Sequence, residues 1–238
     1  MNDKLEQTGL DAVDRFIDTW NSRDAEKWAD SLNFPHVRPS PFGPIEVAGD
    51  SEEYVSRVDF SRVVETGWDH SEWDYKHVIH TSPTKIHVAG QWSRYTEGGE
   101  VILTTPIVYI VTLVDGKWGI QSRFGSDYAG DDDTTGMETR AINLIEDFIN
   151  NANNRNTKAC AELLNYPHYN IGVGDLIGTT SAAEFTLPHG RIDIESLIAL
   201  QTGKRSLNAA MDITVTAASG PHTTTTPHPL PKNTPPPP

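Results

Sequence analysis

Residues 85–123 read KIHVAGQWSRYTEGGEVILTTPIVYIVTLVDGKWGIQSR, and this stretch decides the fold. Its first segment alternates apolar and polar residues, a period of two that is typical of a β-strand with one buried face. Residues 97–100 and the pair Asp115-Gly116 have the composition of hairpin turns. Residues 101–114, between the turns, are rich in β-branched residues and apolar on both faces, which predicts a central strand. Together with a short strand at 77–81, these segments predict an antiparallel sheet.

Ahead of the sheet the apolar period is helical. Asp24 is expected to cap a second short helix, and Pro35 to end it, because a residue before proline is pushed out of the helical region. The proline-containing residues 34–47 suit an edge strand or a bent hairpin. Asp50 and Glu53 resemble a capping box that opens a third helix. Helices followed by antiparallel strands predict an α+β fold, a curved sheet packed on N-terminal helices. The first helix carries one apolar stripe, formed by Leu10, Val13, Phe16, Ile17 and Trp20.

The sequence contains an internal repeat. Residues 16–36 (FIDTWNSRDAEKWADSLNFPH) and residues 148–168 (FINNANNRNTKACAELLNYPH) are identical at nine of 21 positions, at a constant offset of 132. Chance would give roughly one or two such matches, so the pattern indicates a duplicated domain. No convincing alignment continues past Leu187. We therefore expect a truncated or frame-shifted second copy.

The repeat suggests a division of the chain. Residues 1–130 are expected to form a complete domain, residues 131–136 an acidic linker, and residues 137–190 a partial second copy with helices and a first strand. Residues 191–220 fit neither pattern. Residues 221–238 are rich in proline and threonine and hold one aliphatic residue, a composition that predicts disorder.

Charge and composition exclude several classes of function. The 238 residues hold 19 Lys and Arg against 33 Asp and Glu, a formal charge of −14. Nucleic acids and anionic membranes are therefore not expected as partners, because phosphate binding needs a basic surface. The single Cys160 excludes an internal disulfide and a multi-cysteine zinc site. No phosphate-binding or metalloprotease motif is present, so no cofactor and no metal are expected, and the chain has the composition of a cytoplasmic protein.

The order of helix, helix, proline-containing strand, helix and long antiparallel strands resembles the nuclear transport factor 2-like superfamily, which includes SnoaL-like polyketide cyclases. Residues 33–38 (NFPHVR) and 116–123 (GKWGIQSR) are similar to what a SnoaL-like protein shows at those places. The resemblance covers residues 8–128 and, in part, 137–187. It implies a cone-shaped sheet wrapped round a long helix, with a pocket at the wide end. Members include isomerases, dehydratases, epoxide hydrolases and binding modules, so the fold does not give the function.

Two activities of the superfamily lack their motifs here. Ketosteroid isomerases carry a catalytic Asp in an Asp-Pro-Val-Gly stretch, where this chain has Ser40-Pro41-Phe42-Gly43. The epoxide hydrolases carry Arg-x-Asp on a long strand, and the predicted strands show none. A serine hydroxyl cannot replace a carboxylate base, so neither activity is expected.

Four residues are candidates for catalysis. His36 could act as a general base or orient a ligand, although a structural role in an Asn-aromatic-Pro-His turn is the alternative. Asp69 and His70 could form an acid/base pair like that of dehydratase members of the superfamily. The hydroxyl of Tyr109 could donate to a developing oxyanion, or simply be packed in the core.

Four further residues are candidates for ligand binding: Trp20, Arg38, Arg94 and Arg123. Arg38 could hold a carboxylate or an enolate, and it could equally be a solvated charge of an edge strand. The favoured function is an accessory or binding module for a small apolar ligand. The alternative is a cofactor-independent isomerase, dehydratase or cyclase that acts on a hydrophobic carbonyl compound. A homodimer through the sheet face is a further expectation.

Overall fold

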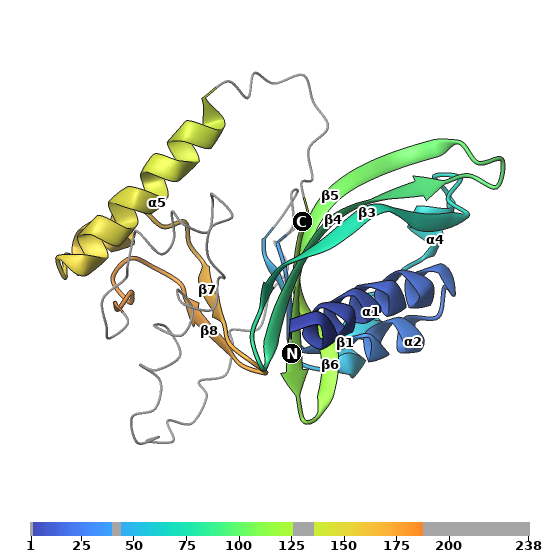
Figure 1. Ribbon diagram of the computed structural model, residues 1–238, viewed down its shortest axis with the longest axis horizontal. Coiled ribbons are helices and arrows are strands. Elements are labelled where there is room, and N and C mark those ends of the chain that lie inside the picture. The colour runs from blue at the N-terminus through green and yellow to red at the C-terminus, as the bar shows by residue number, and fades with distance from the viewer. Residues whose placement is uncertain (1, 40–43, 126–135, 188–238) are drawn as a thin grey trace, which may run out of the picture.

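The computed structural model describes residues 2–39, 44–125 and 136–187 (Figure 1). The first two ranges contain one six-stranded sheet, in the order β2-β1-β6-β5-β4-β3. All pairs are antiparallel except β1 with β6, which is parallel. The predicted α+β class is therefore confirmed, with one parallel pair that the sequence did not indicate. The strands are β1 (Leu32–Arg38), β2 (Glu46–Ala48), β3 (His70–Thr81), β4 (Lys85–Tyr95), β5 (Val101–Val114) and β6 (Lys117–Gly125).

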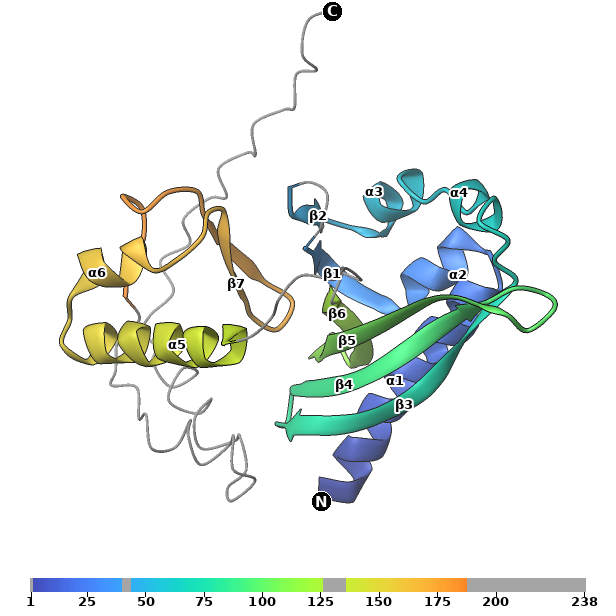
Figure 2. The same ribbon diagram turned by 90° about the horizontal axis from the view of Figure 1, so that it is seen from above.

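Helix α1 (Asn2–Asn21) lies across the inner face of the curved sheet (Figure 2). Its predicted apolar stripe is buried at Val13, Phe16 and Ile17. Near its start the helix lies close to β4, because a Cβ at Gly9 would be 2.6 Å from Cγ2 of Ile86. Glycine therefore permits this close approach of the helix to the sheet.

Three short helices close the side of the sheet next to β1 and β2: α2 (Ala25–Asp30), α3 (Ser51–Ser56) and α4 (Ser61–Val64). Asp24 caps α2 by accepting from the backbone N–H groups of Glu26 and Lys27, as predicted. Asp50 likewise accepts from the N–H of Glu53 at the start of α3. The Glu53 carboxylate accepts from Gly49 N at 2.6 Å, which completes a reciprocal cap one residue earlier than the standard pattern.

The prediction that Pro35 ends the second helix is wrong. Helix α2 ends at Asp30, and Leu32 already belongs to β1. Of the two alternatives for residues 34–47, the edge strand is wrong for β1, because β1 lies between β2 and β6. The hairpin alternative agrees with the structure, because β1 pairs antiparallel with β2. The buried Asn33 holds it in place by donating from Nδ2 to the carbonyl of Thr112 at 2.7 Å. Long-range pairing therefore decides the conformation of this segment, against its local helical pattern.

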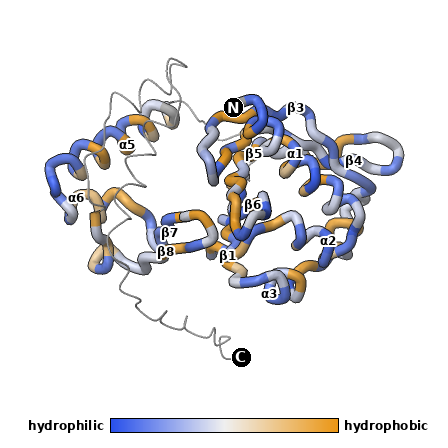
Figure 3. The backbone as a smooth tube through the Cα atoms, turned by 60° about the horizontal axis from the view of Figure 1, so that its bottom comes forward, coloured by the Kyte–Doolittle hydropathy of each residue, from blue (hydrophilic) through white to orange (hydrophobic). Residues whose placement is uncertain are grey.

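The core lies between α1 and the inner face of β4, β5 and β6. Fully buried residues from each strand meet there, and the hydrophobic stretch of β5 is visible in Figure 3. The predicted strands at 85–95 and 101–114 are confirmed with the expected bounds, whereas β3 begins at His70, seven residues before the predicted 77. The buried core is formed by Ala12, Val13, Phe16, Ile17, Trp28, Leu32, Ile86, Val88, Ile107, Tyr109, Val111 and Ile120.

Residues 136–187 form α5 (Met137–Asn153), α6 (Thr157–Glu162) and a hairpin of β7 (His168–Ile171) and β8 (Leu176–Thr179). Two local features recur at the repeat offset of 132. Arg23 and Arg155, which follow α1 and α5, have φ of 58° and 57°. Asn156 caps α6 through the N–H of Ala159, as Asp24 caps α2. These features support a duplication, which stays a proposal.

The β7–β8 hairpin contacts the first domain through a buried glutamine. Gln121 on β6 accepts from the N–H of Gly174 at 3.0 Å and donates to the carbonyl of Asp175 at 3.1 Å. Lys85 on β4 donates to the carbonyl of Ile171 at 2.7 Å. The hairpin is therefore joined to the first domain by polar groups.

Several expectations fall outside the described residues: Ser40-Pro41-Phe42-Gly43, most of the 131–136 linker, residues 191–220 and the 221–238 tail. The cytoplasmic location and the homodimer stay predictions. Among the helices that the structure describes, none has the length and apolar character needed to cross a membrane.

Candidate functional site

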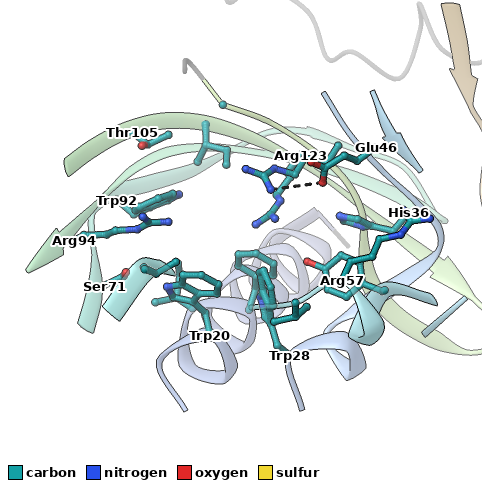
Figure 4. Close-up of a pocket in the computed structure, with 18 of the residues that line it drawn as sticks. Trp20, Trp28, His36, Glu46, Arg57, Ser71, Trp92, Arg94, Thr105 and Arg123 are labelled. Carbon is teal, nitrogen blue, oxygen red and sulfur yellow. Dashed lines mark ion pairs between the residues drawn. The ribbon is translucent and has the colours of Figure 1, made fainter. Parts of the chain in front are cut away.

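A cavity of about 360 Å³ opens between the C-terminal half of α1, the short helices and the inner face of the sheet (Figure 4). Every strand of the large sheet contributes to it, as do α1 to α4. Trp92 and Arg94 on β4 are paired with Thr105 and Leu103 on β5, and all four line the cavity, because alternate side chains of a strand point to the same face.

Aromatic rings form one wall of the cavity. Trp20 from α1 and Trp28 from α2 pack with ring centroids 4.6 Å apart, and Phe16 lies 5.5 Å from Trp28. Tyr54 of α3 meets Trp28 edge to face at 5.3 Å. These rings offer a flat apolar surface of the kind that binds the body of a small organic molecule.

Five arginines also line the cavity, and three of them have an acidic partner. On the paired strands β1 and β2, Arg38 lies 3.7 Å from the carboxylate of Glu46, the pair marked in Figure 4. Arg57 pairs with Glu53 one helical turn earlier, and Arg62 lies 3.5 Å from Asp59. The positive charge of these three arginines is therefore locally balanced.

Arg94 and Arg123 lack such a partner among the residues that the structure describes. Each rests on aromatic faces instead. The guanidinium of Arg94 lies 5.5 Å from the ring centroid of Trp20 and 5.4 Å from that of Trp92. Burial first, and then the charges of Arg123 and Arg38, lower the pKa of Arg94 to about 10. It therefore remains protonated at neutral pH.

The guanidinium of Arg123 lies over two rings on the other side of β5. Its central carbon is 5.1 Å from the ring centroid of Phe16 and 5.2 Å from that of Trp28. The Nε atoms of both Arg94 and Arg123 are buried without a hydrogen-bond partner. Two cations held on aromatic rings, with unused donors, are suited to receive an anion.

His36 is buried beside the cavity on β1. Its Nδ1 lies 3.1 Å from the carbonyl oxygen of Ile120, and a carbonyl oxygen can only accept, so Nδ1 carries the proton. Burial first, and then the nearby Arg123, lower the pKa of His36 to about 3. The imidazole is therefore neutral, and its buried Nε2 has no hydrogen-bond partner. Tyr54, which meets the ring edge to face at 5.4 Å, has its pKa raised by burial.

The structure brings together five of the eight candidate residues. The cavity lining includes Trp20, His36, Arg38, Arg94 and Arg123.

The other three candidates lie away from the lining. Tyr109 is fully buried under the cavity, where its ring contacts Phe16 and Trp73, and burial raises its pKa. Asp69 and His70 do form a pair, with Oδ2 2.9 Å from Nδ1. The pair lies at the start of β3, where His70 stacks on Tyr95. None of the three is part of the cavity surface as the structure has it.

Sequence reasoning missed several lining residues. Trp28 and Trp92 were visible only as apolar positions of a helix and a strand, and Tyr54 as part of a helix. The expectation of an apolar guest also did not anticipate five arginines around one cavity. Alternation on β4 was the available signal, because Trp92 and Arg94 share one face. The part of the chain that the structure describes has no group of three His, Cys, Asp or Glu side chains arranged to hold a metal ion.

No family model matches the chain, and no curated protein matches it in sequence. Solved structures do match. An NTF-2 like protein of unknown function from Shewanella oneidensis MR-1 has 15% identity and a TM-score of 0.41, and the match covers 51% of this chain and 98% of that one. A ketosteroid isomerase-like protein from Erwinia carotovora atroseptica SCRI1043 has 18% identity and a TM-score of 0.43, with 55% and 100% covered. This chain is similar to these NTF2-like and ketosteroid isomerase-like structures in fold, and in fold alone.

Proposed function

We propose that the first domain is a binding module for a small organic anion with an aromatic or alicyclic body. The observation that carries this proposal is the placement of Arg94 and Arg123. Both guanidiniums lie at the cavity, both rest on aromatic rings, and neither has a carboxylate partner in the described part of the chain.

Buried or half-buried cations are costly unless an opposite charge compensates them. The other cavity arginines obtain that charge from Glu46, Glu53 and Asp59. A carboxylate or phosphate of a guest would supply it for Arg94 and Arg123 through charge-assisted hydrogen bonds. The rings of Trp20 and Trp28 would at the same time bury the apolar part of that guest.

The alternative of a cofactor-independent isomerase, dehydratase or cyclase needs a base in the cavity. His36 is the titratable group best placed for this, but a pKa of about 3 makes its neutral form a weak proton acceptor at neutral pH. The carboxylates of Glu46 and Asp59 are engaged by arginines. The geometry therefore favours binding over proton transfer, and we propose no reaction.

Calorimetric titration of the full chain with 2-naphthoate tests the proposal, with 2-naphthamide as the neutral probe of the same shape. We expect 2-naphthoate to bind and the amide to bind at least about ten-fold more weakly, because an ionic hydrogen bond contributes about 1.5–3 kcal/mol. The variants Arg94→Gln and Arg123→Gln should each lose a similar factor for 2-naphthoate.

The matched control is Arg140→Gln on the exposed surface of α5, which removes one positive charge away from the cavity. It should leave the affinity for 2-naphthoate unchanged. Equal affinity for 2-naphthoate and 2-naphthamide, or equal losses in Arg94→Gln and Arg140→Gln, would show that the two guanidiniums do not recognise the guest.

A further inference from the structure

We infer that the guest of this cavity carries two negative charges, as a dicarboxylate or a phosphate monoester does. The inference rests on the proposed function and specifies its ligand class. It follows from the charges around the cavity, where three arginines are paired and two, Arg94 and Arg123, are not. A monoanion would neutralise one of the two and leave the other without a counter-charge.

Arg94 and Arg123 lie on the two strands that flank β5. Arg94 is on β4 and Arg123 is on β6, with β5 between them, and the charge of Arg123 disfavours the protonated form of Arg94. Arg38 adds to this effect, although Glu46 partly offsets its charge. Arg94 and Arg123 line the same cavity without a carboxylate partner in the described part of the chain, so the positive charge there is not balanced. A dianion supplies a counter-charge for both arginines, whereas a monoanion supplies one for a single arginine.

The aromatic wall links the two charged positions. Arg94 rests on Trp20, Arg123 rests on Trp28, and these two tryptophans are in contact. A flat apolar body laid on the tryptophans would therefore have one guanidinium beside Trp20 and another beside Trp28; Arg94 and Arg123 are labelled in Figure 4. Two carboxylates on one rigid body can satisfy both cations, and so can the several oxygens of one phosphate group.

The negative charge of the chain as a whole distinguishes a specific dianion site from non-specific attraction. With 33 acidic against 19 basic residues, the protein as a whole repels a dianion more strongly than a monoanion. Non-specific attraction therefore cannot produce a preference for two negative charges. Such a preference has to come from a local concentration of positive charge, and the cavity is where the structure describes one.

The test compares three probes with the same apolar body on the full chain by calorimetry, at about pH 8 and low salt. The probes are 2-naphthoate (one charge), 2,6-naphthalenedicarboxylate (two charges on two groups) and 2-naphthyl phosphate (two charges on one group). We expect at least one dianion to bind about ten-fold or more tightly than 2-naphthoate. The preference should shrink only modestly as salt is added, because partly buried charges are screened less than exposed ones.

Charge-removing variants locate the effect. Arg94→Gln and Arg123→Gln each leave one unpaired guanidinium, so each should reduce the dianion preference to about three-fold or less. Arg140→Gln should leave the preference at its wild-type value. A larger gain for the dicarboxylate than for the phosphate would mean that the arginines hold two separate groups, and the reverse order would mean that they converge on one.

The outcomes separate the two proposals. If none of the three probes binds, the proposed function is wrong. If 2-naphthoate binds and both dianions bind equally well or more weakly, the organic-anion function stands and the inference of two charges is wrong. A dianion preference that persists unchanged in Arg94→Gln and Arg123→Gln would also overturn the inference, because the preference would then arise elsewhere.

Discussion

Replacing His36 by glutamine should weaken the dependence of stability on pH. The pKa of His36 is about 3 in the folded protein, against about 6.5 for an unperturbed histidine. The unfolded chain therefore binds a proton at a higher pH than the folded chain does. This contribution to stability is complete above pH 6.5 and is lost as the pH falls toward 3.

The size of the effect follows from the two pKa values. Between about pH 7.5 and about pH 5, protonation of His36 in the unfolded chain should lower the free energy of unfolding by about 2 kcal/mol. His87, whose pKa burial lowers to about 4, adds a loss of the same sign. It does so in the wild type and in His36→Gln alike, so the difference between the two proteins isolates His36.

Urea unfolding at the two pH values, followed by tryptophan fluorescence, measures this difference. All six tryptophans lie between residues 20 and 118, so the signal reports on the first domain. The pH-dependent loss in the wild type should exceed that in His36→Gln by about 2 kcal/mol. The absolute free energy of unfolding of each protein does not affect this difference, because each protein is compared with itself at the two pH values.

The control is Ile86→Val, a truncation in the core that removes no titratable group. It should lower the free energy of unfolding by about 0.5–1.5 kcal/mol at both pH values and leave the pH dependence unchanged. The reasoning is refuted if His36→Gln retains the full wild-type loss between the two pH values, since His36 would then titrate alike in the folded and the unfolded chain.

Three more predictions concern packing and the link to the hairpin. Gly119→Ala should lower the free energy of unfolding by about 1–3 kcal/mol in a denaturation experiment, because its Cβ would lie 2.7 Å from Oδ1 of Asn33. Val13→Ala should lower it by about 2 kcal/mol, whereas Ile145→Ala, at the equivalent repeat position but 55% exposed, should change it by less than about 0.5 kcal/mol. Gln121→Leu removes both hydrogen bonds to the β7–β8 turn, so amide hydrogen exchange there should become faster while the large sheet stays protected. Equal effects at positions 13 and 145, or unchanged exchange in the turn, would contradict these assignments.

Much of the fold could be predicted because its signals are local. The alternation along residues 85–95 and the Asp115-Gly116 turn each depend on neighbours in sequence, and β4, β5 and β6 follow them. Residues 32–38 were misjudged because their conformation depends on partners far along the chain. Asn33 is held by Thr112, and β1 pairs in parallel with β6, which local periodicity cannot report.

The candidate site shows the same limit. Arg94 and Arg123 were candidates because they lie on separate predicted strands, but the sequence could not say which arginines would lack an acidic partner. Arg57 and Glu53 are one helical turn apart, a spacing that is readable in sequence. The partner of Arg38, by contrast, is supplied by β2 across a strand pairing. Charge balance is therefore a property of the assembled cavity.

The close approach at Gly9 has a consequence for how the size of the binding space is set. Gly9 and Trp20 are on one helix, about 16 Å apart at 1.5 Å per residue. The helix contacts the sheet near both ends, because Gly9 lies against Ile86 of β4 and Asn21 exchanges hydrogen bonds with the backbone of Ser71 on β3. A larger side chain at position 9 would push the start of α1 away from β4 and so change the tilt of the helix. Added bulk at position 9 would therefore alter the room beside Trp20 without changing any residue that a guest touches. The volume of the cavity and the residues that contact the guest are thus controlled from separate places on the chain. Either can therefore change in evolution while the other is kept.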